Sequence, residues 1–194
     1  MSKKKKVDSL NLREVIRLIP GYAPYKSAGG CVFAEKAAHD AIDFFRECIK
    51  HVKGEKAGQP FILEPWQMAI VANIFGWKRQ DGTRRYREAF IFVPRKNGKT
   101  AMAAAMMLYV LFCDGEPGAE IYSAAADRDQ ATLIYDQARG MVLAEPELYS
   151  RAKIYATGKS ITFEELGSSY KAISADSNTK HGYNSHMVIN DELH

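Results

Sequence analysis

The stretch FIFVPRKNGKT, residues 90–100, constrains the fold of this chain more than any other part of the sequence. The segment EAFIFV at 88–93 is almost wholly apolar, which is typical of a strand buried on both faces. The stretch closes with Gly98-Lys99-Thr100, and the apolar run AMAAAMMLYVLFC follows it. This run is too short to cross a bilayer and predicts a buried helix that begins at Lys99. We therefore expect a strand, a tight loop and a helix in direct succession.

Such a unit is suited to binding phosphate groups. Backbone N–H groups in a tight loop at a helix N-terminus attract anions. Lys99 is expected to hold the β- and γ-phosphates, and the Thr100 hydroxyl is expected to hold Mg²⁺. Arg95 either stabilises charge on the γ-phosphate or pairs with a surface carboxylate. The candidate nucleotide-binding residues of the loop are Pro94, Arg95, Lys96, Asn97, Gly98, Lys99 and Thr100.

The loop departs from the usual pattern G-x-x-x-x-G-K-[ST] at its first position, where Val93 replaces glycine. The tripeptide Gly-Lys-Thr alone is a weak signal, because chance produces it or Gly-Lys-Ser in roughly one chain of this size in ten. The predicted order of strand, loop and helix gives it weight. From these residues, two interpretations stay open. Either Pro94 shapes the turn of a phosphate-binding loop, or a helix start happens to contain this tripeptide.

A second candidate site lies where the apolar strand HMVIND, residues 186–191, runs into Glu192. Hydrolysis of a Mg²⁺-bound nucleotide needs one carboxylate that holds the metal through water and another that deprotonates the attacking water. Asp191 suits the first role and Glu192 suits the second. An acidic pair that only ends a strand is the alternative, and by itself it is the commoner situation. Two motifs in the correct order, with a strand and a helix between them, favour the site.

The rest of the sequence alternates between strand and helix patterns. This alternation predicts an α/β fold with a mostly parallel sheet and helices on both faces. The Asp81-Gly82 pair between basic flanks predicts a hairpin. We expect helices at about 12–18, 35–53, 65–75, 99–113 and 127–143, and strands at about 88–93, 120–126, 152–156, 160–165, 169–175 and 186–191.

Charge and cysteine content restrict the function further. The net charge is +4, and the basic residues come in blocks that suit a polyanionic partner. For the block Lys3–Lys6, solvated surface lysines are an equally good interpretation. The three cysteines have neither metal-site spacing nor an even number, which indicates reduced thiols in a cytosolic protein. The five histidines show no ligand spacing, so we expect no structural metal. The second basic block is Lys78, Arg79, Arg84, Arg85 and Arg87, followed by Arg95, Lys96 and Lys99.

Four segments together resemble the large terminase subunit of tailed bacteriophages, in its N-terminal ATPase half. They are EPWQ, GWKRQDGTRRYREAFIFVPRKNGKT, YSAAADRDQA and KHGYNSHMVINDELH, and the resemblance extends from about Phe61 to His194. The loop of this family characteristically replaces the first glycine and carries an arginine, as VPRKNGKT does. The resemblance therefore favours a phosphate-binding loop over a chance tripeptide.

The resemblance implies a P-loop ATPase of the additional-strand, catalytic-glutamate type, with ATP and Mg²⁺ as cofactors. Gln67 would read the adenine edge, although a solvated helix residue is the plain alternative. Arg95, Lys99 and Glu192 would be catalytic, and Thr100 and Asp191 would hold Mg²⁺ largely through water. Residues 1–54 would form a basic tail and an N-terminal helical region. Residues 55–194 would form the ATPase domain, with a sheet that is incomplete at its C-terminal side.

The resemblance also implies partners. They are double-stranded DNA, a small terminase subunit, the portal protein of the procapsid and further copies of the chain in a ring, in the cytoplasm of a bacterial host. We expect a soluble protein with no membrane partner. The family's nuclease domain has no counterpart in these residues, so nuclease activity is not expected of them. Two alternatives stay open: a helicase-like P-loop ATPase, and a non-catalytic nucleotide- or DNA-binding fragment of a terminase.

Overall fold

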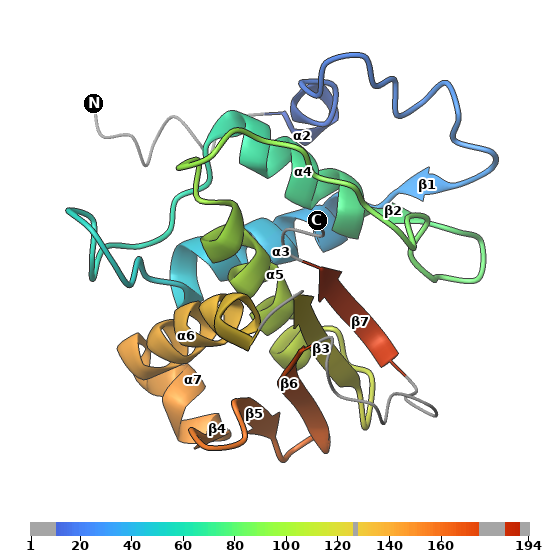
Figure 1. The fold of residues 1–194 in the computed structure, drawn as a ribbon. Coiled ribbons are helices and arrows are strands. Elements are labelled where there is room, and N and C mark those ends of the chain that lie inside the picture. The colour runs from blue at the N-terminus through green and yellow to red at the C-terminus, as the bar shows by residue number, and fades with distance from the viewer. Residues whose placement is uncertain (1–10, 126–127, 175–184, 191–194) are drawn as a thin grey trace. The chain divides into compact units, whose positions relative to one another are not determined.

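The computed structural model describes residues 11–125, 128–174 and 185–190 (Figure 1). The chain divides into two compact units that interleave along the sequence. Unit 1 consists of Met1–Glu47 and Ile62–Phe92, and unit 2 consists of Cys48–Phe61 and Val93–His194. The chain therefore leaves unit 1 once and returns to it before it enters the phosphate-loop region of unit 2.

Unit 1 is built around the apolar helix α4 (Pro65–Gly76), which the sequence predicts closely. Its other elements are α2 (Leu12–Val15), α3 (Glu35–Cys48), β1 (Val32–Phe33) and β2 (Trp77–Lys78). Gly76 ends α4 where a Cβ would lie 2.5 Å from the Phe33 ring, so only glycine fits at this contact. The buried Trp77 follows directly, and its ring centroid lies 5.5 Å from that of Phe33.

The predicted hairpin of unit 1 is confirmed. β2 pairs with β1 on one side, and on the other side Lys78 forms a bridge with Arg84. The turn between them places Gly82 at a φ of 82°, a backbone conformation that glycine adopts without strain. The Asp81 carboxylate accepts hydrogen bonds from the N–H and the hydroxyl of Thr83, at 2.9 and 2.6 Å.

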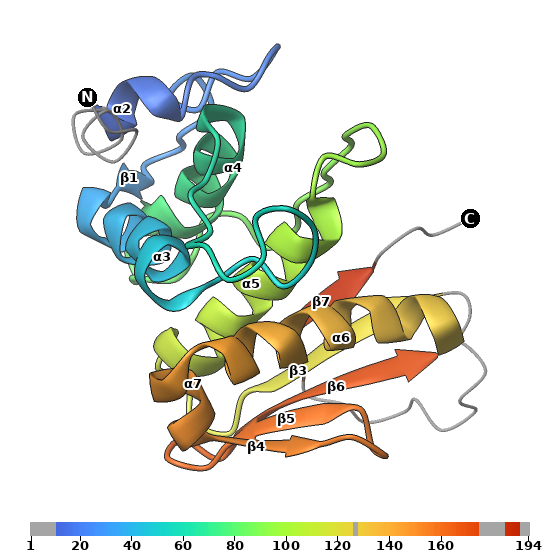
Figure 2. The ribbon, with the colours of Figure 1, turned by 90° about the vertical axis from the view of Figure 1, so that its left-hand side faces the viewer.

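Unit 2 is an α/β unit, as predicted, and its sheet has the strand order β4-β5-β6-β3-β7. Figure 2 shows α5 and α6 over one face of this sheet, whereas we expected helices on both faces. The helices are α5 (Lys99–Cys113), α6 (Arg128–Ala144) and α7 (Pro146–Arg151), and the strands are β3 (Glu120–Ala125), β4 (Ala152–Tyr155), β5 (Ser160–Phe163), β6 (Ser168–Ser174) and β7 (Ser185–Asn190).

The expectation of a mostly parallel sheet is wrong, because the sheet is mixed. β3 pairs in parallel with β6 and with β7, while β4 with β5 and β5 with β6 are antiparallel. The reason is the length of the connections. Short turns join β4, β5 and β6, and a short turn can connect only antiparallel neighbours.

The predicted buried strand at 88–93 is also wrong. The segment has no regular secondary structure, and Phe90 and Phe92 are 93% and 88% exposed. A strand needs a neighbouring strand that accepts and donates its backbone hydrogen bonds. Among the strands that the structure describes, none pairs with this segment.

The helix expected over 35–53 ends at Cys48, because the residues after it pair elsewhere within unit 2. Lys50 forms a bridge with Pro60, and its Nζ donates to the Ala144 carbonyl and pairs with Glu145, each at 3.0 Å. None of the helices in the described ranges is long and apolar enough to cross a membrane.

Candidate functional site

The phosphate-loop candidate lies at the N-terminus of α5, in unit 2. Gly98 precedes the helix with a φ of 72°, and its carbonyl accepts the first helical hydrogen bond from Met102 N at 2.9 Å. The loop residues 94–98 are exposed, whereas Lys99 and Thr100 are half-buried in the first turn. The fifteen-residue helix therefore presents its N-terminal N–H groups beside an exposed loop, which is an arrangement that attracts anions.

The backbone of this loop is held in an unusual conformation. Lys96 has a φ of 66°, which is rare for a residue with a Cβ and costs on the order of 1 kcal/mol. The Asn97 side chain stabilises the turn, since its Nδ2 donates to the carbonyls of Pro94 at 3.1 Å and Arg95 at 3.4 Å. Left-handed residues in a tight turn allow nearby N–H groups to point into one concavity. Lys96 and Gly98 both have this conformation, which is compatible with such a concavity.

Positive side chains surround the same loop. Arg95 and Lys96 are exposed, and neither makes an ion pair with a carboxylate of the described residues. Their charges are thus available to a bound polyphosphate. Lys99, half-buried one residue after Gly98, is at the position from which a P-loop lysine contacts phosphate.

Gln67, the candidate for reading adenine, belongs to unit 1. It is 5% exposed, and its Oε1 accepts a hydrogen bond from the Glu64 N–H at 3.0 Å. The side chain therefore caps the N-terminus of α4, which is a role that the sequence analysis did not anticipate. A carbonyl oxygen has a second lone pair and the amide has two N–H groups, so this cap leaves hydrogen-bonding capacity.

The acidic pair Asp191 and Glu192 lies outside the described residues. The strand that precedes it is β7, which pairs in parallel with β3 as far as Asn190 opposite Ala124. Within the described ranges, no three His, Cys, Asp or Glu side chains gather where they could hold a metal ion.

A polar side-chain contact joins the C-terminal end of α5 to the start of β7. His186 Nε2, near the start of β7, lies 2.5 Å from Asp114 Oδ2, directly after α5. The two side chains are 23% and 16% exposed. This contact helps to fix β7 along α5, the helix that begins at the phosphate loop. Nothing in the sequence indicated it, since the two residues are 72 positions apart.

A second polar contact fixes β6 beside β3 in the middle of the sheet. The hydroxyls of Ser123 and Tyr170 lie 2.7 Å apart and both residues are fully buried. Burial raises the pKa of the Tyr170 hydroxyl far above its usual value, so this group stays neutral. The contact therefore positions strands and is unsuited to proton transfer.

Comparison with known proteins places these elements in a family. The family described as "Terminase large subunit, ATPase domain" matches residues 65–194, which is more than half of the chain. The chain is 30% identical over 141 residues to the terminase large subunit of Enterobacteria phage HK97, covering 72% of this chain and 27% of that protein. It is 30% identical over 110 residues to the terminase large subunit of Lactococcus phage p2, covering 55% and 20%.

A solved structure agrees with these relatives. The crystal structure of the HK97 bacteriophage large terminase superimposes with a TM-score of 0.69 at 29% identity. The match covers 80% of this chain and 31% of that one. The chain thus spans less than a third of the length of the relatives that it matches.

Proposed function

Because this chain belongs to the family of the terminase large subunit ATPase domain, we propose that it hydrolyses ATP to power the packaging of double-stranded DNA into phage procapsids. ATP hydrolysis is the general activity of that domain. The observation that carries the proposal is the exposed, left-handed loop at the start of α5, which ends in Gly98-Lys99-Thr100. Its fold type would be the additional-strand, catalytic-glutamate class of P-loop ATPases.

Binding of ATP would begin at this loop. The N–H groups of residues 95–98 and of the first turn of α5 would bind the phosphate oxygens, and Lys99 would neutralise the β- and γ-phosphates. Arg95 is exposed beside them and is placed in sequence to offset charge that develops on the γ-phosphate. Gln67 would select adenine with the hydrogen-bonding capacity that its capping role leaves.

Oxygen ligands at this site fit Mg²⁺, which prefers hydroxyl, carboxylate and water oxygens. Thr100 lies in the first turn of α5, and Asp191 directly follows β7 in the sequence. When bound, Mg²⁺ would neutralise the phosphate oxygens. Glu192 would orient the attacking water and accept its proton as that water attacks the γ-phosphorus, while the bond from the γ-phosphorus to the β,γ-bridging oxygen breaks and ADP leaves.

The proposed setting follows from the family. Double-stranded DNA, the small terminase subunit, the portal protein and further copies of the chain in a ring would be partners, in the cytoplasm of the bacterial host. The match to a terminase family over residues 65–194 supports this function over a helicase-like ATPase. A non-catalytic nucleotide-binding fragment is the second candidate, and turnover separates it from the first.

The test is ATP turnover by the purified 194-residue chain, with and without double-stranded DNA. We expect turnover by the parent chain and none above background for Lys99→Ala, which should also lose nucleotide binding. Glu192→Gln should bind nucleotide like the parent and lose hydrolysis, because only the proton acceptor is removed. Lys53→Ala, which changes an exposed lysine elsewhere in unit 2, is the matched control and should behave like the parent.

Two results would contradict the proposal. If Lys99→Ala and Glu192→Gln both bound and hydrolysed ATP like the parent, the site assignment would be wrong. If the parent bound ATP but never turned it over, the non-catalytic candidate would be favoured.

A further inference from the structure

Positive charge is concentrated on the hairpin of unit 1, residues 77–87. This segment has five basic residues and one acidic residue, Asp81. The basic side chains of α3 differ, because Lys36 pairs with Asp40 at 2.7 Å and Arg46 pairs with Asp43 at 2.8 Å. Among the described residues, no carboxylate pairs with the hairpin residues Lys78, Arg79 and Arg87.

One of the five basic residues anchors the hairpin. The Arg85 guanidinium lies 4.8 Å from the ring centroids of both Trp77 and Tyr86. It also donates to the Pro24 carbonyl at 2.8 Å and to the Ser27 hydroxyl at 2.9 Å. Arg85 therefore holds the hairpin against the buried Trp77, and the other four basic residues account for its charged surface.

Lys78 and Arg84 lie on the outer face of the hairpin. Lys78 is directly opposite Arg84 in the bridge and directly opposite Val32 on its other side. The Val32 side chain is 65% exposed. Directly opposite residues share a face, and the opposite face holds the buried Phe33 and Trp77. Two like charges so placed, with Cβ atoms about 5 Å apart, repel each other. A bound anion would be attracted by both side chains.

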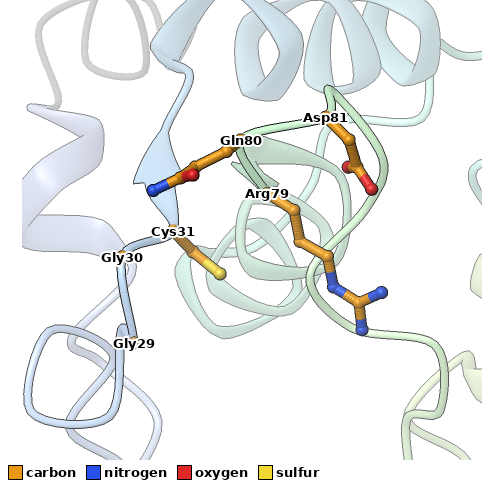
Figure 3. A pocket seen from close by; sticks show the side chains of 6 residues that line it. All are labelled: Gly29, Gly30, Cys31, Arg79, Gln80 and Asp81. Carbon is orange, nitrogen blue, oxygen red and sulfur yellow. The ribbon is translucent and has the colours of Figure 1, made fainter.

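A pocket of about 430 Å³ opens beside the hairpin (Figure 3). One wall is the backbone of Gly29 and Gly30, with φ angles of 55° and 80°. The N–H groups of these two glycines donate no hydrogen bond within the described residues. Gln80 extends toward Gly30, with its Nε2 3.6 Å from where a Cβ would stand, and Arg79 leaves the hairpin in another direction. Residues with backbone and side-chain donors therefore line the same pocket.

Asp81 is the one acidic side chain in the lining of this pocket. Its Oδ1 is occupied by the hydroxyl and N–H of Thr83, and these hydrogen bonds hold the pKa of the carboxyl below its usual value. The carboxylate is committed to the turn, and the other residues that line the pocket, among them Arg79, Gln80 and the two glycines, carry no carboxylate.

We propose that this hairpin and the pocket beside it bind the phosphate backbone of double-stranded DNA. A free phosphate meets one or two cations, whereas duplex DNA carries one charge per about 1.7 Å of its axis and meets all of them at once. Lys78 and Arg84 contact phosphates along the outer face, Arg79 contacts one from the pocket lining, and the N–H groups of Gly29 and Gly30 donate to a phosphate oxygen in the pocket. The choice of duplex DNA rests on the proposed function.

The test compares DNA binding by two triple variants of the full chain. Lys78→Gln/Arg79→Gln/Arg84→Gln neutralises the hairpin, and Lys53→Gln/Lys56→Gln/Lys171→Gln removes the same charge from exposed positions of unit 2. The hairpin variant should bind a duplex at least about tenfold more weakly at about 0.1 M salt. The slope of log affinity against log salt should fall by about 2 to 3. The unit 2 variant should keep most of the affinity and slope.

A second measurement reports on the pocket without any substitution. Amide resonances of Gly29 and Gly30 should shift when duplex DNA is added to the parent chain. If inorganic phosphate shifted these resonances to saturation while duplex DNA at the same phosphate concentration did not shift them, the assignment to DNA would be overturned. Loss of affinity that is equal in the two triple variants would overturn it as well.

The outcomes separate this inference from the proposed function. If the parent chain hydrolyses ATP and the hairpin variant binds DNA as tightly as the parent, only this inference is overturned. If the parent chain neither binds nor hydrolyses ATP, and the hairpin variant binds DNA more weakly than the parent, this inference is supported and the proposed function is contradicted.

Discussion

Two apolar segments flank the candidate phosphate loop, and they behave in opposite ways. The segment before the loop, 88–93, has no regular structure, and Phe92 is 88% exposed. The segment after it forms α5, in which ten residues are buried, among them Phe112 at 7% exposed. Both segments are about equally apolar, so hydrophobicity does not explain the difference.

The difference lies in the backbone. A helix satisfies its own N–H and C=O groups, and it then needs only a surface on which to bury its side chains. α5 finds such a surface within unit 2, where Phe112 packs on Phe163 of β5 with ring centroids 5.1 Å apart. A strand needs a neighbour for both purposes, and among the described residues the segment at 88–93 has none. An apolar pattern predicts burial only if a partner for the backbone exists.

The sharpest test of this comparison makes the same change on both sides of the loop. Phe112→Ala removes a buried ring and should lower the free energy of unfolding by about 3 to 5 kcal/mol. Phe92→Ala removes an exposed ring and should change it by less than about 0.5 kcal/mol. Denaturant unfolding with equal m-values would measure both. Equal losses in the two variants would mean that Phe92 is buried in solution and that the comparison fails.

A smaller effect is expected on association. Exposed aromatic side chains on an unpaired apolar segment favour contacts between chains. Phe90→Ser/Phe92→Ser should reduce self-association, measured by sedimentation velocity over a range of concentrations. Tyr149→Ser/Tyr155→Ser, which changes two exposed aromatic residues of unit 2, is the matched control. Equal effects of the two double variants would show that the segment at 88–93 has no special role in association.

The smallest effect concerns the hairpin just before the exposed segment. In this hairpin the backbone of Lys78 pairs with that of Arg84. Hydrogen bonds from the Thr83 hydroxyl and N–H hold the pKa of Asp81 below 3.8. A lowered pKa in the folded state means that the stabilisation is complete above the unfolded pKa and is lost as pH falls through the native pKa. Thr83→Ala should raise the Asp81 pKa toward 3.8 in a carboxyl NMR titration, and Thr83→Ser should not. An unchanged pKa in Thr83→Ala would assign the shift to the backbone alone.

Local signals in the sequence determined much of this protein. Pro65, which suits a first helical position, predicted a helix at 65–75, and the structure has α4 at Pro65–Gly76. An Asp-Gly pair predicted the hairpin, and the apolar run predicted α5 from Lys99 to Cys113. These elements depend on residues close in sequence, such as caps, turns and helix neighbours. Short motifs likewise indicated the family of the chain, because phosphate binding requires particular residue types at fixed spacings.

Contacts between distant residues were decided only by the tertiary structure. The sheet is mixed, and His186 meets Asp114 across 72 positions of the chain. The left-handed Lys96 and the pocket at Gly29 and Gly30 also left no trace in the sequence pattern. A pattern of apolar residues records how much surface a segment must bury. It does not record which segment supplies the partners for the backbone hydrogen bonds. α5 supplies its own and is buried, whereas the segment 88–93 pairs with no described strand and is exposed.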